Sequence, residues 1–309
     1  MKNTLKKRTF ISAIAMLIVS AIVLTSSTFA WFSMAKRVEV ETMELNITSP
    51  DGVQLSGNAN AFTTMLTLAD LKGETSARWA AYEGNINNFP ELLKPSSSTM
   101  SVLNSLPTFF AGSVDDASKL NVTQVEDDTK GGYVAFDVFV QVGKETNVYW
   151  NETTVSCEDN PDVLSAMRVA VVNCGPVAAK ADADAILGVL PVNAAQHRVT
   201  MYQPNANLHT DSSGYADDAA GVPDYYFKAP CSGVNPGGNG KNITVSDTYT
   251  AAPNGIQLTD KNMDTEAYFT AVKGINRVRV YLWMEGNDVD CENSVAGATL
   301  GFNLVFTIK

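Results

Sequence analysis

Histidine is scarce in this chain of 309 residues. The two histidines, His197 and His209, lie in different sequence contexts. A zinc protease of the H-E-x-x-H type needs two imidazoles on one helical face beside a glutamate base, so the sequence excludes that class. The sequence also lacks a G-x-S-x-G nucleophile turn, a P-loop and a Rossmann glycine pattern between a strand and a helix. We therefore expect a protein that is not an enzyme and that uses no organic cofactor.

Positive charge is the second shortage. Twenty-two Lys and Arg residues stand against 33 Asp and Glu residues, which gives a net charge of −11. Four of the basic residues lie in the first eight positions and residues 1–30 contain no acid, so a chain without that segment has a net charge of −15. Such a charge disfavours nucleic acid and anionic membranes as partners, and it favours solubility at a cell surface.

The N-terminus has the three parts of a secretory signal. A positively charged start is followed by the apolar run Phe10–Leu24, and the small residues Thr28 and Ala30 occupy the positions that a signal peptidase reads. We predict that residues 1–30 form a signal helix that is cleaved between Ala30 and Trp31. The alternative is an uncleaved anchor, because the apolar stretch, continued past the cleavage site, approaches the roughly 18–20 residues that a tilted helix needs.

Cysteine is rare as well, with four residues that all lie beyond position 150. Outside the cytoplasm such cysteines pair into disulfides, and four cysteines allow three pairings. We favour the pairs Cys157–Cys174 and Cys231–Cys291. Four unpaired thiols are the alternative.

Three segments alternate apolar and polar residues with the period of two that a half-buried strand requires. They cover residues 132–142, 277–285 and 299–309. In the first segment four valines and a phenylalanine share one face and Asp137 lies on the other. In the second segment Arg277 lies on the outward face. We predict a long strand at each segment, with one buried face.

Helix is limited to short turns, which we expect at 63–71 and 182–187. The remaining stretches are rich in turn residues. This pattern predicts an all-β fold, a jelly-roll-like antiparallel β-sandwich with long loops that spans residues 31–309. We expect a partly helical insertion at 63–113, where clean alternation is missing, and a second insertion or long loop at 182–253.

The segment 38–48, which follows the cleavage site, is a candidate strand for assembly. A phase change of one residue within it indicates a bulge or a switch between sheets. After cleavage this strand would have no hairpin partner before it, so it can pair within its own subunit or with a neighbour. A sandwich without one strand exposes unpaired N–H and C=O groups, and head-to-tail exchange makes a filament because it does not close. Its apolar residues fall in two phases, Val38 and Val40 in the first and Met43, Leu45 and Ile47 in the second.

The sequence around the cleavage site, Thr28–Ser33, leads into the β-prone stretch Met43–Ile47. Together they resemble the SipW-dependent export signal of the TasA/camelysin class of Firmicutes surface proteins. Later stretches also look like recurring pieces of these proteins, namely 132–139, 148–150, 167–170 and 278–291.

The resemblance implies a jelly-roll-like sandwich, export with a SipW-type signal peptidase, and a place at the cell surface or in the extracellular matrix. Members of the class form fibres of the biofilm matrix by lending an N-terminal strand to the next subunit. We therefore expect a secreted structural protein that self-associates into fibres and that meets the membrane only through an uncleaved signal. The alternative is a monomeric surface adhesin or carbohydrate-binding module.

One acidic loop is a candidate calcium site. Asn287, Asp288, Asp290 and Glu292 fall within one turn. Calcium takes six to eight oxygen ligands, which include loop carbonyls, although the spacing here is not that of an EF-hand. The alternative is a turn that caps itself, in which Asn and Asp side chains bond their own backbone.

Overall fold

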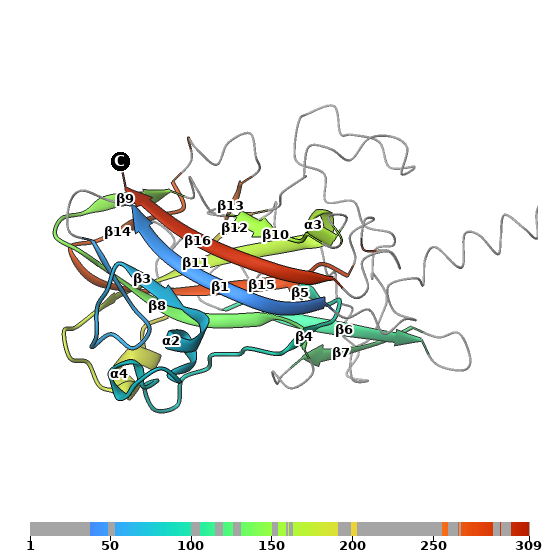
Figure 1. Ribbon diagram of the computed structural model, residues 1–309, viewed down its shortest axis with the longest axis horizontal. Helices are drawn as coiled ribbons and strands as arrows, with labels where there is room; N and C mark the ends of the chain where they lie inside the picture. Colours follow the sequence, from blue (N-terminus) through green and yellow to red (C-terminus); the bar gives the residue numbers. More distant parts are fainter. Residues whose placement is uncertain are drawn as a thin grey trace, which may run out of the picture.

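The computed structural model shows a protein built from β-strands (Figure 1). Strands predominate and the helices are few and short, which confirms the predicted all-β class. The structure describes residues 38–48, 53–99, 106–114, 120–125, 131–149, 154–158, 160, 163–190, 199–202, 255–258, 265, 267–286, 291 and 298–308.

In the described part of the chain, seven strands form the first sheet. Its main path runs β14-β9-β16-β1-β3, while β10 also pairs with β16 and β4 with β1. The bounds of these strands are β1 Val38–Thr48, β3 Met65–Thr67, β4 Leu92–Leu93, β9 Thr146–Tyr149, β10 Thr154–Ser156, β14 Phe269–Ala271 and β16 Thr299–Ile308.

The second sheet has six described strands in the order β13-β12-β11-β15-β8-β2, and β5, β6 and β7 form a small third sheet. The second sheet contains β2 Gln54–Ser56, β8 Val134–Val142, β11 Met167–Val177, β12 Val199–Tyr202, β13 Gly255–Leu258 and β15 Gly274–Met284. The small sheet contains β5 Ser97–Thr99, β6 Thr108–Val114 and β7 Leu120–Val125. Strands β8, β15 and β16 lie in the three segments where alternation predicted them.

Most neighbouring strands run antiparallel, as predicted, but two described pairs are parallel. These are β1 with β16 and β12 with β13. Antiparallel neighbours are often joined by a tight hairpin, which fixes their direction. Strands β1 and β16 are the first and last described strands, so no hairpin joins them and parallel pairing is open to them.

The first two sheets face each other across one apolar core. Met43 and Leu45 of β1 belong to the same buried cluster as Leu304 of β16, Phe136 of β8 and Val280 of β15. In Figure 1, β1 and β16 run side by side across the front of the molecule, with β8, β11 and β15 behind them. The core therefore lies between the pair β1–β16 and the long strands of the second sheet.

The second sheet is buried on both faces, which alternation alone did not predict. Every residue of β15 after Gly274 is buried. Phe109 of β6 packs in one cluster and Tyr82 in another on the face that points away from the sandwich core. Asp137 and Arg277 do lie on this outer face, but the covering segments enclose them.

The helices are short, as expected for the ranges 63–71 and 182–187. Helix α2, Leu68–Lys72, starts with a capping box between Thr67 and Asp70, and helix α4, Ala183–Leu187, starts at the N-cap Asp182. The other described helical turns are η1 Ala77–Trp79 and α3 Val163–Ala166.

The range 63–113 is partly integrated into the sandwich. Its strands β3 and β4 both pair with β1 in the first sheet, and β5 and β6 belong to the small sheet. In the range 182–253, α4 and β12 are described, and β12 belongs to the second sheet.

Candidate assembly site

Strand β1, the candidate assembly strand, occupies an interior place in the first sheet of its own chain. On one side it pairs along nearly its whole length with β16, from Glu39 opposite Thr299 to Thr48 opposite Thr307. On the other side it pairs only with short strands, with β4 near its start and with β3 near its end. The strand is therefore held mainly by the last described strand of the chain.

The predicted phase change is a β-bulge. The register between β1 and β16 shifts between Val40 and Thr42, so that Val40 lies opposite Leu300 and Met43 lies opposite Phe302. The strand remains in one sheet over its full length, which excludes the alternative of a switch between sheets. One extra residue in one strand of a pair is the usual origin of such a shift.

The apolar face of β1 points into the core. Met43 is 2% exposed and Leu45 is fully buried. Burial of side chains of this size contributes roughly 1.5–3 kcal/mol each before ordering costs. The backbones of Val38, Val40 and Ile47 are placed in β1, whereas their side chains lie outside the described set.

The outer face of β1 carries a polar contact to β16. The side-chain amide of Asn46 donates to the side-chain oxygen of Asn303 over 3.1 Å, and both residues are partly buried. A slip of two residues would keep every side chain on its own face, so the apolar pattern alone does not exclude it. The Asn46–Asn303 contact is specific to the observed register.

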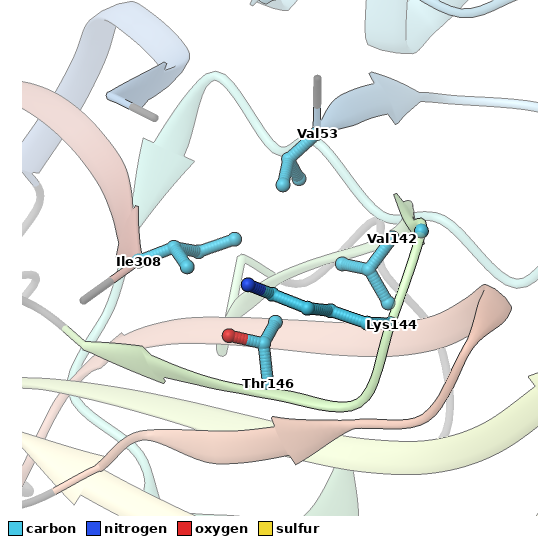
Figure 2. A pocket seen from close by; sticks show the side chains of 6 residues that line it. Val53, Val142, Lys144, Thr146 and Ile308 are labelled. Carbon is cyan, nitrogen blue, oxygen red and sulfur yellow. The ribbon is translucent and has the colours of Figure 1, made fainter. Parts of the chain in front are cut away.

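A pocket opens between the two sheets at the end where β1 and β16 finish. Its volume is about 300 Å³. Figure 2 shows the side chain of Lys144, on the turn between β8 and β9, extending among the apolar side chains from both sheets. The lining residues are Val53, Val142, Gly143, Lys144, Thr146 and Ile308.

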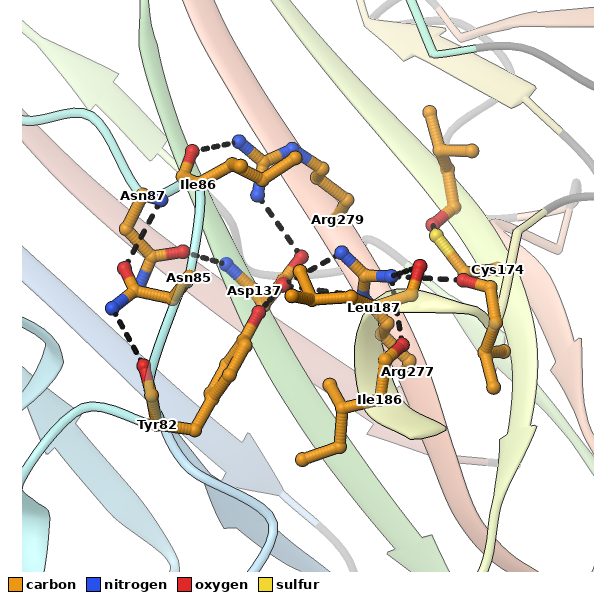
Figure 3. A network of polar contacts seen from close by, with 12 residues as sticks. Tyr82, Asn85, Ile86, Asn87, Asp137, Cys174, Ile186, Leu187, Arg277 and Arg279 are labelled. Carbon is orange, nitrogen blue, oxygen red and sulfur yellow. Dashed lines mark hydrogen bonds and ion pairs between the residues drawn. The ribbon is translucent and has the colours of Figure 1, made fainter. Parts of the chain in front are cut away.

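The outer face of the second sheet holds a buried charge cluster (Figure 3). Asp137 accepts hydrogen bonds from Arg277, at 2.9 and 3.1 Å, and from Arg279 at 3.1 Å. The hydroxyl of Tyr82 donates to the same carboxylate. Asp137 and Arg277 have no exposed surface, and Arg279 is 2% exposed. Neutral main-chain oxygens accept further hydrogen bonds from the two guanidinium groups.

Those oxygens belong to the two segments that cover the sheet. Arg277 donates to the main-chain carbonyls of Ile186 and Leu187 in the last turn of α4 and of Val189 just after it. Arg279 donates to the carbonyl of Ile86. One carboxylate thus positions two guanidinium groups, and each guanidinium binds a different covering segment.

Three groups of the cluster have pKa values above their ordinary ones, namely Arg277, Arg279 and Tyr82. Burial is the largest single effect and lowers the pKa of Arg277, but Asp137, Cys174 and Tyr82 together raise it by more, so the net pKa lies above its ordinary value. Burial likewise opposes the charge of Arg279, and Tyr281 and Asp137 outweigh it, which raises the pKa. Burial and the charge of Asp137 raise the pKa of Tyr82, so it stays a hydroxyl donor. A sealed carboxylate with these partners suits anchoring and not proton transfer to a substrate.

Sequence reasoning assigned no role to this cluster. Alternation placed Asp137 and Arg277 on an outward face, where charged residues are ordinarily solvated. One signal was available, since a single Asp interrupts an otherwise apolar run from Val134 to Val140. The partner segments were not identifiable, because they come from distant parts of the chain.

No family model matches the chain, and comparison with curated proteins and with solved structures finds no match.

The cysteines differ from the predicted pairing. Cys174 lies on the outer face of the second sheet, forms no disulfide, and its thiol contacts the carbonyl of Val172 over 3.7 Å. Cys157 lies in the core between the two sheets. The structure therefore corrects the predicted Cys157–Cys174 bond, because the two side chains are on opposite faces of the second sheet. The pair Cys231–Cys291 stays a prediction, because Cys231 lies outside the described residues.

Two other predicted sites lie outside the described residues. They are the cleavage site Ala30–Trp31 and the candidate calcium loop with Asn287, Asp288, Asp290 and Glu292. Within the described ranges, no three His, Cys, Asp or Glu residues gather in a way that would hold a metal ion. None of the helices in that same part of the chain is long and apolar enough to cross a membrane.

Proposed function

We propose that this chain is a secreted, non-enzymatic structural protein of the cell surface, a subunit of an extracellular fibre or biofilm matrix that assembles by exchange of β1. The observation that carries the proposal is the position of β1. The first strand of the sandwich lies in the interior of a sheet, and its main neighbour is the last strand, so no hairpin ties it in place. Every copy of the chain has the same position beside β16, so the β1 strand of another copy can occupy it.

The energetics support exchange. A first sheet without β1 leaves the backbone of β16 unpaired along one edge. It also exposes the part of the core that Met43 and Leu45 fill. Such an edge recruits a complementary strand, and a strand from a second copy restores all of these contacts. Exchange between identical copies therefore costs little enthalpy, and the link between β1 and β2 decides its geometry.

The finer features of the fold and of export belong to the same proposal. The chain passes repeatedly from one sheet to the other, between β1 and β2 and again between β8 and β9, which supports a jelly-roll-like sandwich. The sequence around Ala30 and Trp31 supports cleavage by a SipW-type signal peptidase. We infer that the mature chain starts near residue 31 and that only an uncleaved signal would meet the membrane.

Cross-linking tests the exchange directly. Asn46→Cys and Asn303→Cys are made in separate chains, mixed in equal amounts during assembly, and treated with a short thiol-to-thiol cross-linker. Exchange predicts covalent pairs in which residue 46 of one chain is joined to residue 303 of another, identified by peptide mass spectrometry. A chain that carries both substitutions is the control for reagent reach.

The opposite outcome is equally clear. If each β1 stays in its own chain, the mixture gives no 46–303 link between chains, while the double variant gives a link within one chain. That result, together with a monomer on size-exclusion chromatography, would reject fibre assembly by β1 and favour the monomeric adhesin.

A further inference from the structure

One end of the sandwich combines the end of β1 with the open pocket. Thr48 lies opposite Thr307 there, and Ile308, Val53 and Val142 line the pocket beside them. We call this end the pocket pole. The other end, where β1 and β16 begin and β4 pairs with β1, is the far pole.

The link between β1 and the rest of the chain is short. Four residues, 49–52, separate Thr48 from Val53. Five peptide units span at most about 17 Å. When β1 enters a neighbour in the observed register, its end arrives at the neighbour's pocket pole, while Val53 stays at the pocket pole of its own chain. Exchange therefore brings the two pocket poles within about 17 Å of each other.

We propose, on the basis of the strand exchange proposed above, that the pocket poles of two copies of this chain face and contact one another. The surface suits a contact with itself. The turn β8–β9 exposes Lys144 and Glu145, and the turn β14–β15 exposes Lys273. Because both charge signs are present, two copies of this pole can meet with opposite charges paired.

The contact sets the geometry of the assembly. Each subunit lends its own strand from its pocket pole and receives a strand at that same pole. The pocket poles of successive subunits therefore lie along the axis of a fibre, and the far poles point away from it. Two subunits that exchange reciprocally satisfy both links with a single contact between poles.

Gly143 offers a variant that blocks this contact without disturbing the subunit. A Cβ atom added at Gly143 meets no atom within 4 Å, and the residue is exposed. Gly143→Arg therefore leaves the thermal unfolding of the monomer unchanged, while its bulk at the pocket pole reduces assembly at least tenfold by sedimentation. Assembly equal to that of the unaltered chain would overturn the proposal.

Cross-linking between identical positions maps the contact. Glu145→Cys at the pocket pole and Glu91→Cys near the far pole both replace exposed glutamates, and neither residue lines the pocket. With a short bis-maleimide, assembled Glu145→Cys protein gives covalent pairs and Glu91→Cys protein does not, with the unaltered chain as background. The reverse pattern would overturn the proposal.

The two proposals fail in different ways. A 46–303 link between chains without a link at residue 145 keeps strand exchange and rejects contact between the pocket poles. Absence of the 46–303 link between chains rejects strand exchange itself. Covalent pairs at residue 145 that never exceed two subunits keep the contact between poles and reject the fibre.

Discussion

At the scale of single residues, Asp137 is the position on which the cover of the second sheet depends. Its carboxylate is the shared partner of Arg277 and Arg279, and no part of it reaches solvent. Removal of one partner from a buried ion pair leaves an uncompensated charge, which is more costly than replacement of the whole group by apolar residues.

We expect Asp137→Asn to lower the free energy of unfolding by about 3–5 kcal/mol. The asparagine has the same size, so the loss reflects charge and not volume. Urea unfolding, followed by tryptophan fluorescence, measures it. Tyr82→Phe is the matched control, because it removes one hydroxyl from the same carboxylate and should cost only about 1–3 kcal/mol. Equal losses in the two variants would contradict the assigned role of Asp137.

Cys174 gives the structure a pH dependence on the alkaline side. Burial raises the pKa of its thiol to about 12 from an ordinary value of 9.0, with Arg277 opposing and Asp137 adding to the shift. The raised pKa means that the folded state holds the proton more tightly. The thiol therefore stabilises the fold fully below pH 9, and this contribution is lost as the pH rises from 9 to 12.

We expect Cys174→Ala to reduce the decline in the free energy of unfolding between pH 9 and pH 11. The pKa values of Tyr82 and Tyr281 are also raised, so only the difference between the variant and the unaltered chain isolates the thiol. Below pH 9 the two chains should differ by a constant offset from the lost side chain. Parallel curves throughout the alkaline range would refute the prediction. Chemical unfolding at fixed pH values provides the measurement.

At the scale of elements, β1 is the strand whose core-facing residues decide both stability and assembly. Leu45 is fully buried between the sheets, whereas its neighbour Glu44 is exposed on the outer face. The two positions therefore separate the effect of the core from that of the surface.

We expect Leu45→Asp to lower the melting temperature strongly and to stop assembly, since an unpaired charge enters an apolar core. Truncation to alanine at such a position already costs about 2–5 kcal/mol. Glu44→Gln is the control and should change stability by less than about 0.5 kcal/mol. Calorimetry and electron microscopy of each variant supply the two readouts. An unchanged melt of the Leu45→Asp subunit would mean that its own core does not use β1.

Alternation predicts those strands in which most of the large apolar residues lie on one face. Strands β8, β15 and β16 were predictable because their valine, leucine and phenylalanine residues repeat every second position, and the bulge in β1 was visible as a phase change. The parallel pairing of β1 with β16 was not predictable, since it joins the first and last described strands and has no turn to mark it.

The charge cluster was missed for a related reason. A local pattern reports which face a side chain occupies, and it reported that face correctly for Asp137 and Arg277. Whether that face is exposed to solvent depends on segments from distant parts of the chain that pack on it, here the segment around Tyr82 and the end of α4. The predicted Cys157–Cys174 pair failed in the same way, because spacing along the chain does not reveal which side of a sheet each cysteine faces.

At the scale of the whole molecule, the sandwich is completed by the two ends of the described chain. Strand β16 supplies one member of the central pair of the first sheet and β1 supplies the other. Only residues 49–52 connect β1 to the remainder. The molecule therefore divides into a strand and a body with a groove, and any copy of the strand in the correct register fits any copy of the body.

This division predicts complementation in trans. A chain that begins at Val53 lacks β1, and we expect it to unfold at a lower temperature than the full sandwich. A synthetic peptide of residues 38–48 should restore stability in proportion to the logarithm of its concentration, by about 2.7 kcal/mol at one hundred times its dissociation constant. The same peptide with Leu45→Asp should have no effect, because its charge cannot enter the core between the sheets. If the truncated chain melts like the full one, or if both peptides stabilise it equally, β1 does not fill a selective groove. A response to the native peptide alone would mean that the groove accepts β1 without a covalent link, which is the property that exchange between subunits requires.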